Sequence, residues 1–369
     1  MNSEERKAAR RARREAQRMA KKEARTEACT LETMCDLNAL HKAQRQASRG
    51  VSWKASTQRY QIDWLLNINK THNDLMAGRE VCRGFHEFDI VERGKKRHIS
   101  SVHFSERVPQ KALSQNVLIP SIKPSLIDRN SANIKGKGVS YALAMLKRDL
   151  TRHWQRHGSE GYILLMDYSD YFASIDHCTV KRMLRKYILD ERALELALHF
   201  VDVQGERGLG LGSEPNQIEA VALPNPVDHF ACECLGLEAY ARYMDDSYAI
   251  HVDKEYLYYC AMMLKDKCAQ LGITVNNRKT RICKLSKGFT FLKKRVCYGD
   301  NGSVVMRPSR TSITTTRRKV KKHARMVDLG IMTEDQANSS FQSMVGSWSG
   351  LRAYHARISV ERLYRSLHL

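Results

Sequence analysis

Residues 242–250 read RYMDDSYAI, two short apolar or aromatic half-strands on either side of an Asp-Asp pair. This pattern predicts a β-hairpin whose turn presents the carboxylates of Asp245 and Asp246. An acidic pair at a turn is often no more than a solvated loop. A second acidic strand end favours a functional pair here, because residues 162–166 form a continuous apolar run typical of a buried strand and Asp167 follows it directly.

Carboxylates that meet at the ends of such strands supply the hard oxygen ligands that Mg²⁺ prefers. Three of them side by side would repel one another strongly unless divalent cations lay between them. Two metal ions about 3.5–4 Å apart are a known device for in-line phosphoryl transfer. The sequence therefore predicts that Asp167, Asp245 and Asp246 are the catalytic residues of a polymerase palm and hold two Mg²⁺ ions, with Mn²⁺ as an alternative.

The charge of the chain favours a polyanionic partner. Its 369 residues carry 62 Lys and Arg against 40 Asp and Glu, a net charge of +22, and 42% of them are hydrophobic. This hydrophobic content excludes a wholly disordered protein, and the charge favours nucleic acid over a membrane. Residues 301–325 hold eight Lys or Arg and no acid, so we expect them to contact nucleic acid. Residues 1–25 hold ten Lys or Arg and four Glu, which suits either a basic helical arm or a solvated tail.

Two further features bear on location and on metal binding. No apolar run approaches the roughly 18 residues of a membrane span, and the charged N-terminus lacks the apolar stretch of a signal peptide. Ten cysteines without an export signal predict reduced thiols in a cytoplasmic protein. Their spacing predicts no zinc site, since Cys232 and Cys234 form a lone pair without a second pair or nearby histidines.

Over roughly residues 90–350 the chain resembles the bacterial reverse transcriptases, the lineage of the group II intron, retron, diversity-generating and phage-defence enzymes. Residues 243–246, YMDD, are similar to the YxDD box of that family, and residues 167–177, DYSDYFASIDH, resemble its first acidic motif. The resemblance implies that Asp167 and Asp245 hold both metal ions and that Asp246 assists them. It also implies that Phe172 is the aromatic gate that excludes a 2′-hydroxyl and so selects dNTPs, where the residue pattern alone would allow an ordinary core aromatic.

Two lysine-containing motifs would bind the incoming dNTP. Residues 94–99, GKKRHI, resemble the basic strand of the family's fingers. Strand alternation puts Lys95 and Arg97 on one face, where they would clamp a triphosphate unless the strand is simply solvated. Residues 276–280, NNRKT, resemble a later motif in which Lys279 would lie near the leaving pyrophosphate and donate a proton.

One motif departs from the group II intron form, which carries Pro-Gln-Gly, three residues and then Ser-Pro. Residues 210–217 read GLGSEPNQ, with Leu211 in place of Gln and with Asn216 and Gln217 in place of Ser and Pro. This version resembles the diversity-generating and phage-defence enzymes. In the family this region packs under the nascent base pair, so Gln217 is expected to contact the dNTP and the departure predicts altered fidelity.

The order of the predicted elements indicates an α/β (α+β) protein, and the resemblance implies the right-hand polymerase fold. We expect a basic helical extension at 1–50, fingers at 51–160, a palm of antiparallel sheet plus helices at 161–300 with a fingers segment around 199–217, and a helical thumb at 301–369. The chain ends about where a thumb should, so autonomous intron mobility is not expected. Further predictions are helices over 31–46, 180–188 and 254–270, strands over 95–103, 273–275 and 289–296, and a capping box at Thr333 and Gln336.

The resemblance implies an RNA-directed DNA polymerase that copies a dedicated non-coding RNA into DNA, with anti-phage defence as the expected setting. Its partners would be dNTPs, the RNA template and primer, the RNA–DNA hybrid, and either an accessory protein or a second copy of the chain. An error-prone diversity-generating enzyme and a catalytically silent RNA-binding protein stay open as alternatives, as does priming from a protein hydroxyl. The three clustered acids argue against a silent protein, because a retired site need not keep them.

Overall fold

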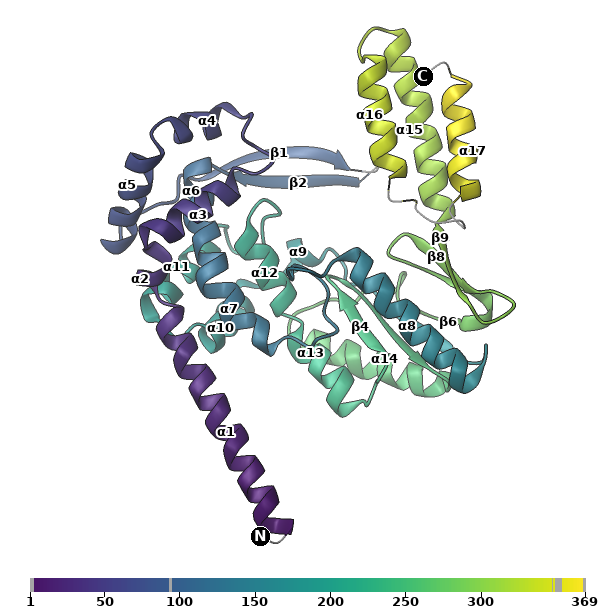
Figure 1. The fold of residues 1–369 in the computed structure, drawn as a ribbon, viewed down its shortest axis with the longest axis horizontal. Helices are drawn as coiled ribbons and strands as arrows, with labels where there is room; N and C mark the ends of the chain where they lie inside the picture. Colours follow the sequence, from purple (N-terminus) through teal and green to yellow (C-terminus); the bar gives the residue numbers. More distant parts are fainter. Residues whose placement is uncertain (1–2, 93–94, 347, 349–353, 368–369) are drawn as a thin grey trace. The chain divides into compact units, whose positions relative to one another are not determined.

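The computed structural model of the chain describes residues 3–92, 95–346, 348 and 354–367, as helices joined to antiparallel strands (Figure 1). The predicted mixed α/β class with antiparallel sheets is therefore confirmed. The chain divides into two compact units. Unit 1 contains Met1–Lys135, Tyr168–His229 and Asp266–Thr274, and unit 2 contains Gly136–Asp167, Phe230–Lys265 and Val275–Leu369. The division into extension, fingers, palm and thumb stays a prediction.

Unit 1 is built mainly of helices. Its strands β1 (Phe85–Glu92) and β2 (Lys95–Val102) pair as an antiparallel hairpin, which confirms the strand predicted over residues 95–103. Its helices and short helical turns are α1 (Ser3–Ala28), α2 (Leu31–Cys35), α3 (Leu37–Ala47), α4 (Ala55–Ile62), α5 (Trp64–Met76), α6 (Phe104–Leu113), η1 (Ser114–Leu118), α7 (Ile119–Ile122), η2 (Lys123–Ser125), α9 (Tyr171–Ser174), α10 (His177–Tyr187), α11 (Glu191–Asp202), α12 (Glu214–Ala222) and α13 (Asn225–His229).

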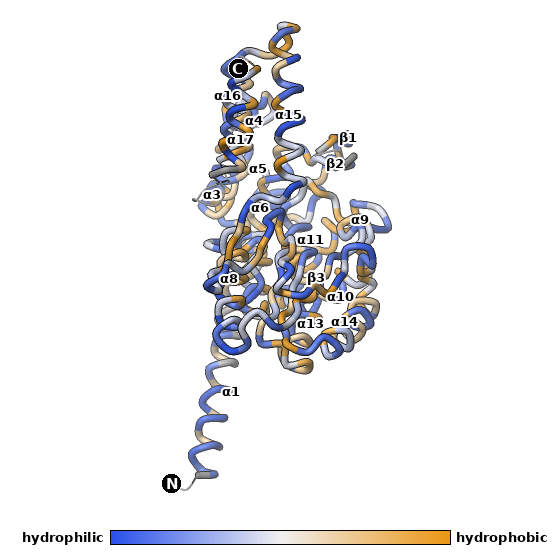
Figure 2. The backbone as a smooth tube through the Cα atoms, turned by 90° about the vertical axis from the view of Figure 1, so that its right-hand side faces the viewer, coloured by the Kyte–Doolittle hydropathy of each residue, from blue (hydrophilic) through white to orange (hydrophobic). Residues whose placement is uncertain are grey.

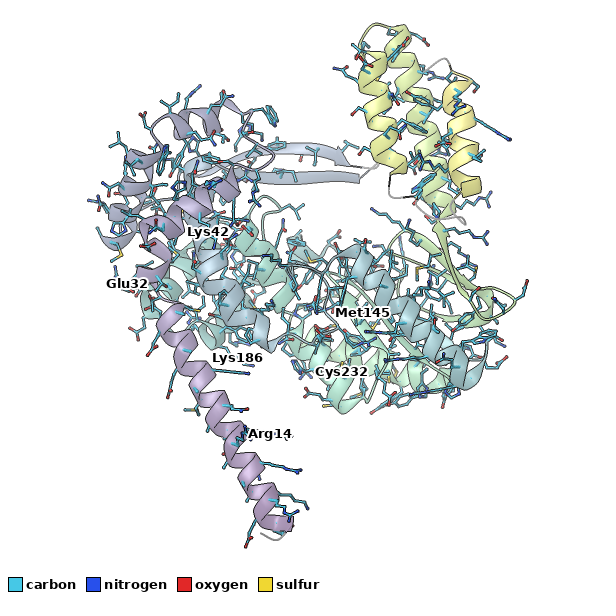
Figure 3. The ribbon with its side chains drawn as sticks, viewed as in Figure 1. Arg14, Glu32, Lys42, Met145, Lys186 and Cys232 are labelled. Atoms are coloured by element: carbon cyan, nitrogen blue, oxygen red, sulfur yellow. The ribbon has the colours of Figure 1, made fainter. Side chains whose placement is uncertain are left out.

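Helix α1 confirms that the basic N-terminal segment is helical. Every side chain that the structure describes between Glu4 and Ala28 is exposed. The helix consists mostly of Ala, Lys, Arg and Glu and has no stripe of large apolar residues to bury, so tertiary packing does not stabilise it. Figure 2 shows α1 as a mainly hydrophilic segment, and Figure 3 shows the side chain of Arg14 standing out from it.

Unit 2 is built around a four-stranded antiparallel sheet with the strand order β4-β5-β3-β6. Its strands are β3 (Tyr162–Met166), β4 (Tyr240–Tyr243), β5 (Asp246–His251) and β6 (Arg281–Lys284). Ile163 and Leu165 of β3 pack in one apolar cluster with Leu146 and Leu150 of helix α8 (Val139–His157). Both the buried strand over 162–166 and the hairpin within 242–250 are confirmed.

A second antiparallel sheet of unit 2 has the order β7-β8-β9, with β7 (Phe289–Phe291), β8 (Lys294–Tyr298) and β9 (Val304–Pro308). The single strand predicted over 289–296 is therefore wrong, since a hairpin occupies that range. The connecting residues Leu292 and Lys293 have φ of +42° and +64°. Two successive residues with positive φ suit a tight hairpin, although such turns usually contain Gly or Asn.

The C-terminal helices of unit 2 form a small bundle. Helices α15 (Arg310–Asp328), α16 (Glu334–Val345) and α17 (Tyr354–Arg365) lie side by side in Figure 1. Thr333 and Gln336 form the predicted capping box at the start of α16. The core of the bundle consists of apolar side chains from all three helices and the segment after α16, namely Val320, Phe341, Val345, Trp348, Val360 and Tyr364.

The remaining helical elements of unit 2 are η3 (Phe230–Cys234), α14 (Lys254–Ala269) and η4 (Leu285–Lys287), and the last turn of α14 belongs to unit 1. The helices predicted over 180–188 and 254–270 correspond to α10 and α14. Among the described residues, none of the helices has the length and apolarity that crossing a membrane requires.

Two predicted elements differ from the structure. The helix expected over 31–46 breaks at Asp36, whose side chain accepts hydrogen bonds from the backbone N–H groups of Asn38 and Ala39 and so begins α3 as an N-cap. The strand expected over 273–275 is reduced to a single bridge residue, Val275. These residues follow the turn at Gly272, which has φ of +70°, and the carbonyl of Thr274 accepts a single hydrogen bond from the N–H of Ser169.

Helix α12 buries an acid. The side chain of Glu219 is 1% exposed, and its Oε2 atom has no hydrogen-bond partner. Burial raises the pKa of Glu219 to about 8. Because the folded form keeps its proton up to a higher pH than the unfolded chain, the free energy of unfolding falls as the pH rises from about 4.5 to about 8.

We therefore expect Glu219→Gln, which keeps the shape and cannot ionise, to stabilise the protein. The gain should be about 3 kcal/mol at pH 7 at most, and close to zero at pH 4.5, since one pKa unit corresponds to about 1.36 kcal/mol. Denaturant unfolding at several pH values measures it. Glu214→Gln is the matched control on the same helix, because Glu214 pairs with Lys111 and its loss should not stabilise at any pH. A pH-independent effect of Glu219→Gln would contradict the expectation.

Candidate metal-binding and catalytic site

The Asp-Asp pair lies at the tip of the β4–β5 hairpin. Tyr243 pairs with Asp246 at the end of the ladder, so Met244 and Asp245 form the connection. Met244 has φ of +55°, a conformation that a residue with a side chain rarely adopts. Arg242, which is 1% exposed, donates a hydrogen bond from Nη1 to the carbonyl of Met244 at 2.9 Å. The guanidinium thereby holds the turn that presents the two carboxylates.

The strand register places the third carboxylate beside them. Strand β3 pairs antiparallel with β5, and the last pair is Met166 with Ser247. One step further in the same register, Asp167 lies opposite Asp246 at the same end of the sheet. The three predicted carboxylates therefore come from adjacent strands of one sheet within unit 2.

A lysine from the loop before β6 reaches this cluster. Lys279 Nζ lies 2.7 Å from both carboxylate oxygens of Asp167. Asn276 positions the loop, because its side-chain oxygen accepts from the N–H groups of Arg278 and Lys279 while its own N–H donates to the carbonyl of Asp167. The side chain of Asp167 is 9% exposed, so this ammonium balances a carboxylate that water hardly reaches.

The carboxylates repel one another. Burial, and then the charges of Asp245 and Asp167, raise the pKa of Asp246 to about 7, against a smaller lowering by Lys279. Burial lowers the pKa of Lys279, but its hydrogen bond to Asp167 and the charges of all three carboxylates outweigh burial and raise it. The site therefore favours positive charge.

These residues fit divalent cations. The donors are hard carboxylate oxygens of the kind that Mg²⁺ and Mn²⁺ prefer, and a cation, the Lys279 ammonium, already lies against Asp167.

The other predicted site residues belong to unit 1. Lys95 and Arg97 lie on strand β2, but their side chains lie outside the described part of the structure. Phe172 is half-buried on α9, and its ring contacts that of Tyr171 edge to face with centroids 5.9 Å apart. Gln217 is half-buried on α12, where its Oε1 accepts from Asn133 Nδ2 at 3.4 Å. The roles of these four residues toward a dNTP stay predictions.

Two residues that the sequence did not single out shape the site regions. One is Arg242. The sequence offered one sign of its importance, namely a charged side chain inside an otherwise apolar half-strand. The other is Gln204, whose Oε1 accepts from the N–H of Gly210 at 2.8 Å and from Asn216 Nδ2 at 2.6 Å. Asn216 Nδ2 also donates to the carbonyl of Gly210. Asn216, which departs from the intron motif, therefore has a structural role. Its side chain ties the end of the 210–216 loop to Gly210 at the start of the loop.

No protein-family model matches the chain, and no curated protein matches it either. Among solved structures, the chain is similar to the telomerase from Candida albicans, solved in complex with the TWJ fragment of telomeric RNA, with a TM-score of 0.49 and 11% sequence identity. The match covers 79% of this chain and 55% of the telomerase chain, so this chain spans about half the length of that protein.

Proposed function

We propose that the chain is an RNA-directed DNA polymerase, a nucleotidyltransferase of the reverse-transcriptase type. The observation that carries this proposal is the convergence of Asp167, Asp245 and Asp246 at one end of the sheet β4-β5-β3-β6. Carboxylates gathered in this way destabilise the fold unless cations offset their repulsion, and the chain is otherwise strongly basic. Such an arrangement suits a protein that binds divalent metal ions and a polyanionic substrate.

In this proposal Asp167 and Asp245 hold two Mg²⁺ ions, with Mn²⁺ as an alternative, and Asp246 assists. Bound Mg²⁺ supplies Lewis-acid stabilisation of the attacking and leaving oxygens in phosphoryl transfer. Lys279, whose loop is tethered by Asn276, would lie beside the Asp167 ligand and would donate a proton to the leaving pyrophosphate. The ammonium thus serves both as a counter-ion of Asp167 and as an acid.

The nucleotide would be bound by the residues of unit 1. Lys95 and Arg97 clamp the triphosphate, Phe172 closes the sugar pocket against a 2′-hydroxyl, and Gln217 lies under the nascent base pair. An anchored backbone supports the role of Phe172, whose carbonyl accepts a hydrogen bond from the N–H of Leu209 at 2.8 Å. Tyr171, the preceding residue, is buried and donates its hydroxyl to the carbonyl of Ala220 at 2.6 Å.

The template would be a dedicated non-coding RNA, bound in the cytoplasm together with the RNA–DNA hybrid and used in anti-phage defence. Two exposed basic surfaces support a nucleic-acid partner. One is α1, and the other is the face of α15 and α17, where Arg317, Arg318 and Lys321 line a pocket of about 310 Å³. Phosphate groups are the natural ligands of such surfaces.

Neutralising α1 should weaken RNA binding in a salt-dependent way. We expect replacement of Arg10, Arg11, Arg13 and Arg14 by Gln to reduce the slope of log K against log salt by about 3, since each phosphate contact contributes about 0.7–0.9. Filter binding at several salt concentrations measures the slope. Replacement of Glu4, Glu5, Glu15 and Glu23 by Gln, on the same helix, is the matched control and should strengthen binding. An unchanged slope in the arginine variant would show that α1 is a solvated tail.

Incorporation of labelled dNTPs tests the proposed function. The protein is purified with the RNA that accompanies it, incubated with Mg²⁺ and dNTPs, and the product is sequenced. DNA that appears with the parent, is absent with the Asp245→Ala, Asp246→Ala double variant and maps to one RNA would support both the chemistry and the template. If RNA is bound but no DNA forms under any tested metal or primer, the chain is a silent RNA-binding protein and the proposal fails.

A further inference from the structure

Three metal-ligating side chains of different types converge on the surface of unit 1. Glu80 and Cys82 lie in the segment between α5 and β1, and His199 lies in the last turn of α11, 119 positions from Glu80. One donor atom from each side chain lies within 4.8 Å of the donors of the other two. His199 Nε2 is 3.0 Å from both carboxylate oxygens of Glu80.

The carboxylate of Glu80 is held in place by its own segment. The backbone N–H of Cys82 donates to Glu80 Oε1 at 2.6 Å, so the short loop that carries the thiol also orients the carboxylate. A second acid, Glu106, lies close by. It is 2% exposed, and its Oε1 accepts from the N–H of Arg83 at 2.5 Å. The segment 80–83 is therefore anchored to two carboxylates.

The donor set suits a borderline metal rather than Mg²⁺. Zn²⁺ is bound by Cys sulfur, His nitrogen and Asp or Glu oxygen at about 2.0–2.3 Å, in tetrahedral geometry. These bond lengths separate neighbouring ligand atoms by about 3.3–3.8 Å, so atoms already within 4.8 Å need only small side-chain movements to meet one ion. Sulfur and imidazole nitrogen are poor ligands for Mg²⁺.

We propose that Glu80, Cys82 and His199 form a site for a transition-metal ion of the Zn²⁺ class. As the S–Zn bond forms, the thiol of Cys82 loses its proton to solvent, and a water molecule or Glu106 completes the fourth position. The ion fastens the 79–84 segment, from which β1 begins, to helix α11. Cysteine spacing could not reveal this site, because its ligands come from two distant segments and include one thiol. The site is independent of the polymerase proposal.

An ordinary surface ion pair is the competing explanation. The side chains of Glu80 and His199 are 57% and 39% exposed, and an exposed pair of this kind contributes little to stability. In an ion pair the thiol of Cys82 would donate a hydrogen bond to the carboxylate of Glu80 and would keep its proton. The two explanations differ in whether a thiolate ligates the metal.

Titration with Co²⁺ distinguishes the metal site from the ion pair. Co²⁺ replaces Zn²⁺, and its absorption spectrum depends on its ligands. Excess Mg²⁺ is present throughout, so that the carboxylates of unit 2 do not compete. We expect one Co²⁺ per chain with a thiolate charge-transfer band, loss of this band in Cys82→Ser, and affinity weakened by about tenfold or more in His199→Ala. Cys178→Ser, which changes an exposed thiol on α10, is the matched control and should leave the titration unchanged.

A thermal unfolding measurement tests whether the variants are folded and whether they bind Zn²⁺. Zn²⁺ should raise the Tm of the parent and of Cys178→Ser but not that of Cys82→Ser, while the metal-free Tm of all three stays similar. Absence of a thiolate band in the parent would overturn the proposal. So would a band that persists in Cys82→Ser, or one that disappears equally in Cys178→Ser.

Discussion

Asp245→Asn will abolish nucleotide incorporation and at the same time make the metal-free protein more stable. Loss of one carboxylate removes a metal ligand, and we expect the rate to fall by about 10³-fold or more. The same loss relieves the repulsion that helps to raise the pKa of Asp246, which should add on the order of 1 kcal/mol to the free energy of unfolding in a chelator.

In the presence of divalent metal the parent should instead be more stable than Asp245→Asn. Mg²⁺ at one hundred times its dissociation constant would stabilise the parent by about 2.7 kcal/mol, whereas the variant has lost a ligand and should gain less. Thermal unfolding in chelator and in Mg²⁺, together with single-nucleotide incorporation, provides the three measurements. Asp300→Asn, an exposed acid in the same unit, is the control and should change none of them. A variant that is less stable in chelator would show that Asp245 has a structural role instead.

Phe172→Ala should remove discrimination against ribonucleotides. If the ring fills the space that a 2′-hydroxyl needs, its loss opens that space, and the preference for dNTPs over rNTPs should fall by about 100-fold, within the range that steric fit provides. Incorporation of dNTPs should be largely retained. Competition between the dNTP and rNTP forms of one base, on an RNA template, measures the ratio.

Phe172→Tyr is the matched variant, because it keeps the bulk of the ring and should keep the discrimination. The neighbouring anchor, the hydrogen bond from Tyr171 to the carbonyl of Ala220, is untouched in both variants. A loss of stability and of dNTP incorporation in Phe172→Ala, with unchanged discrimination, would identify Phe172 as an ordinary packing residue.

Local pattern was sufficient for the elements that hold the carboxylates. The apolar run of 162–166 and the half-strands around Asp245 form their predicted strands, because a central strand buried on both faces must be apolar throughout. Their pairing could not be read from spacing, since antiparallel neighbours can lie anywhere in the chain. The acidic ends of both strands suggested that Asp167 and Asp245 meet, and the resemblance to a family supplied their expected roles as metal ligands.

The features that the residue pattern did not mark are one turn of unusual composition and several polar contacts made by single side chains. The turn at Leu292 and Lys293 has positive φ without Gly or Asn, so nothing in its composition marks it. The buried Arg242 and the clamp by Gln204 have polar partners that only the folded chain brings near. Lys279 was expected near pyrophosphate, and the structure adds that it pairs with Asp167.

The length of α1 determines how much RNA it can contact. Its 26 residues extend about 39 Å at 1.5 Å per residue. Phosphates follow one another about every 3.4 Å along one strand of B-form DNA and more closely along A-form RNA, so the helix can lie beside at least about eleven of them. An RNA that is too short to span α1 leaves some basic residues of the helix without a phosphate to contact. The contribution of α1 to affinity should therefore rise with RNA length and then level off, largely without regard to sequence.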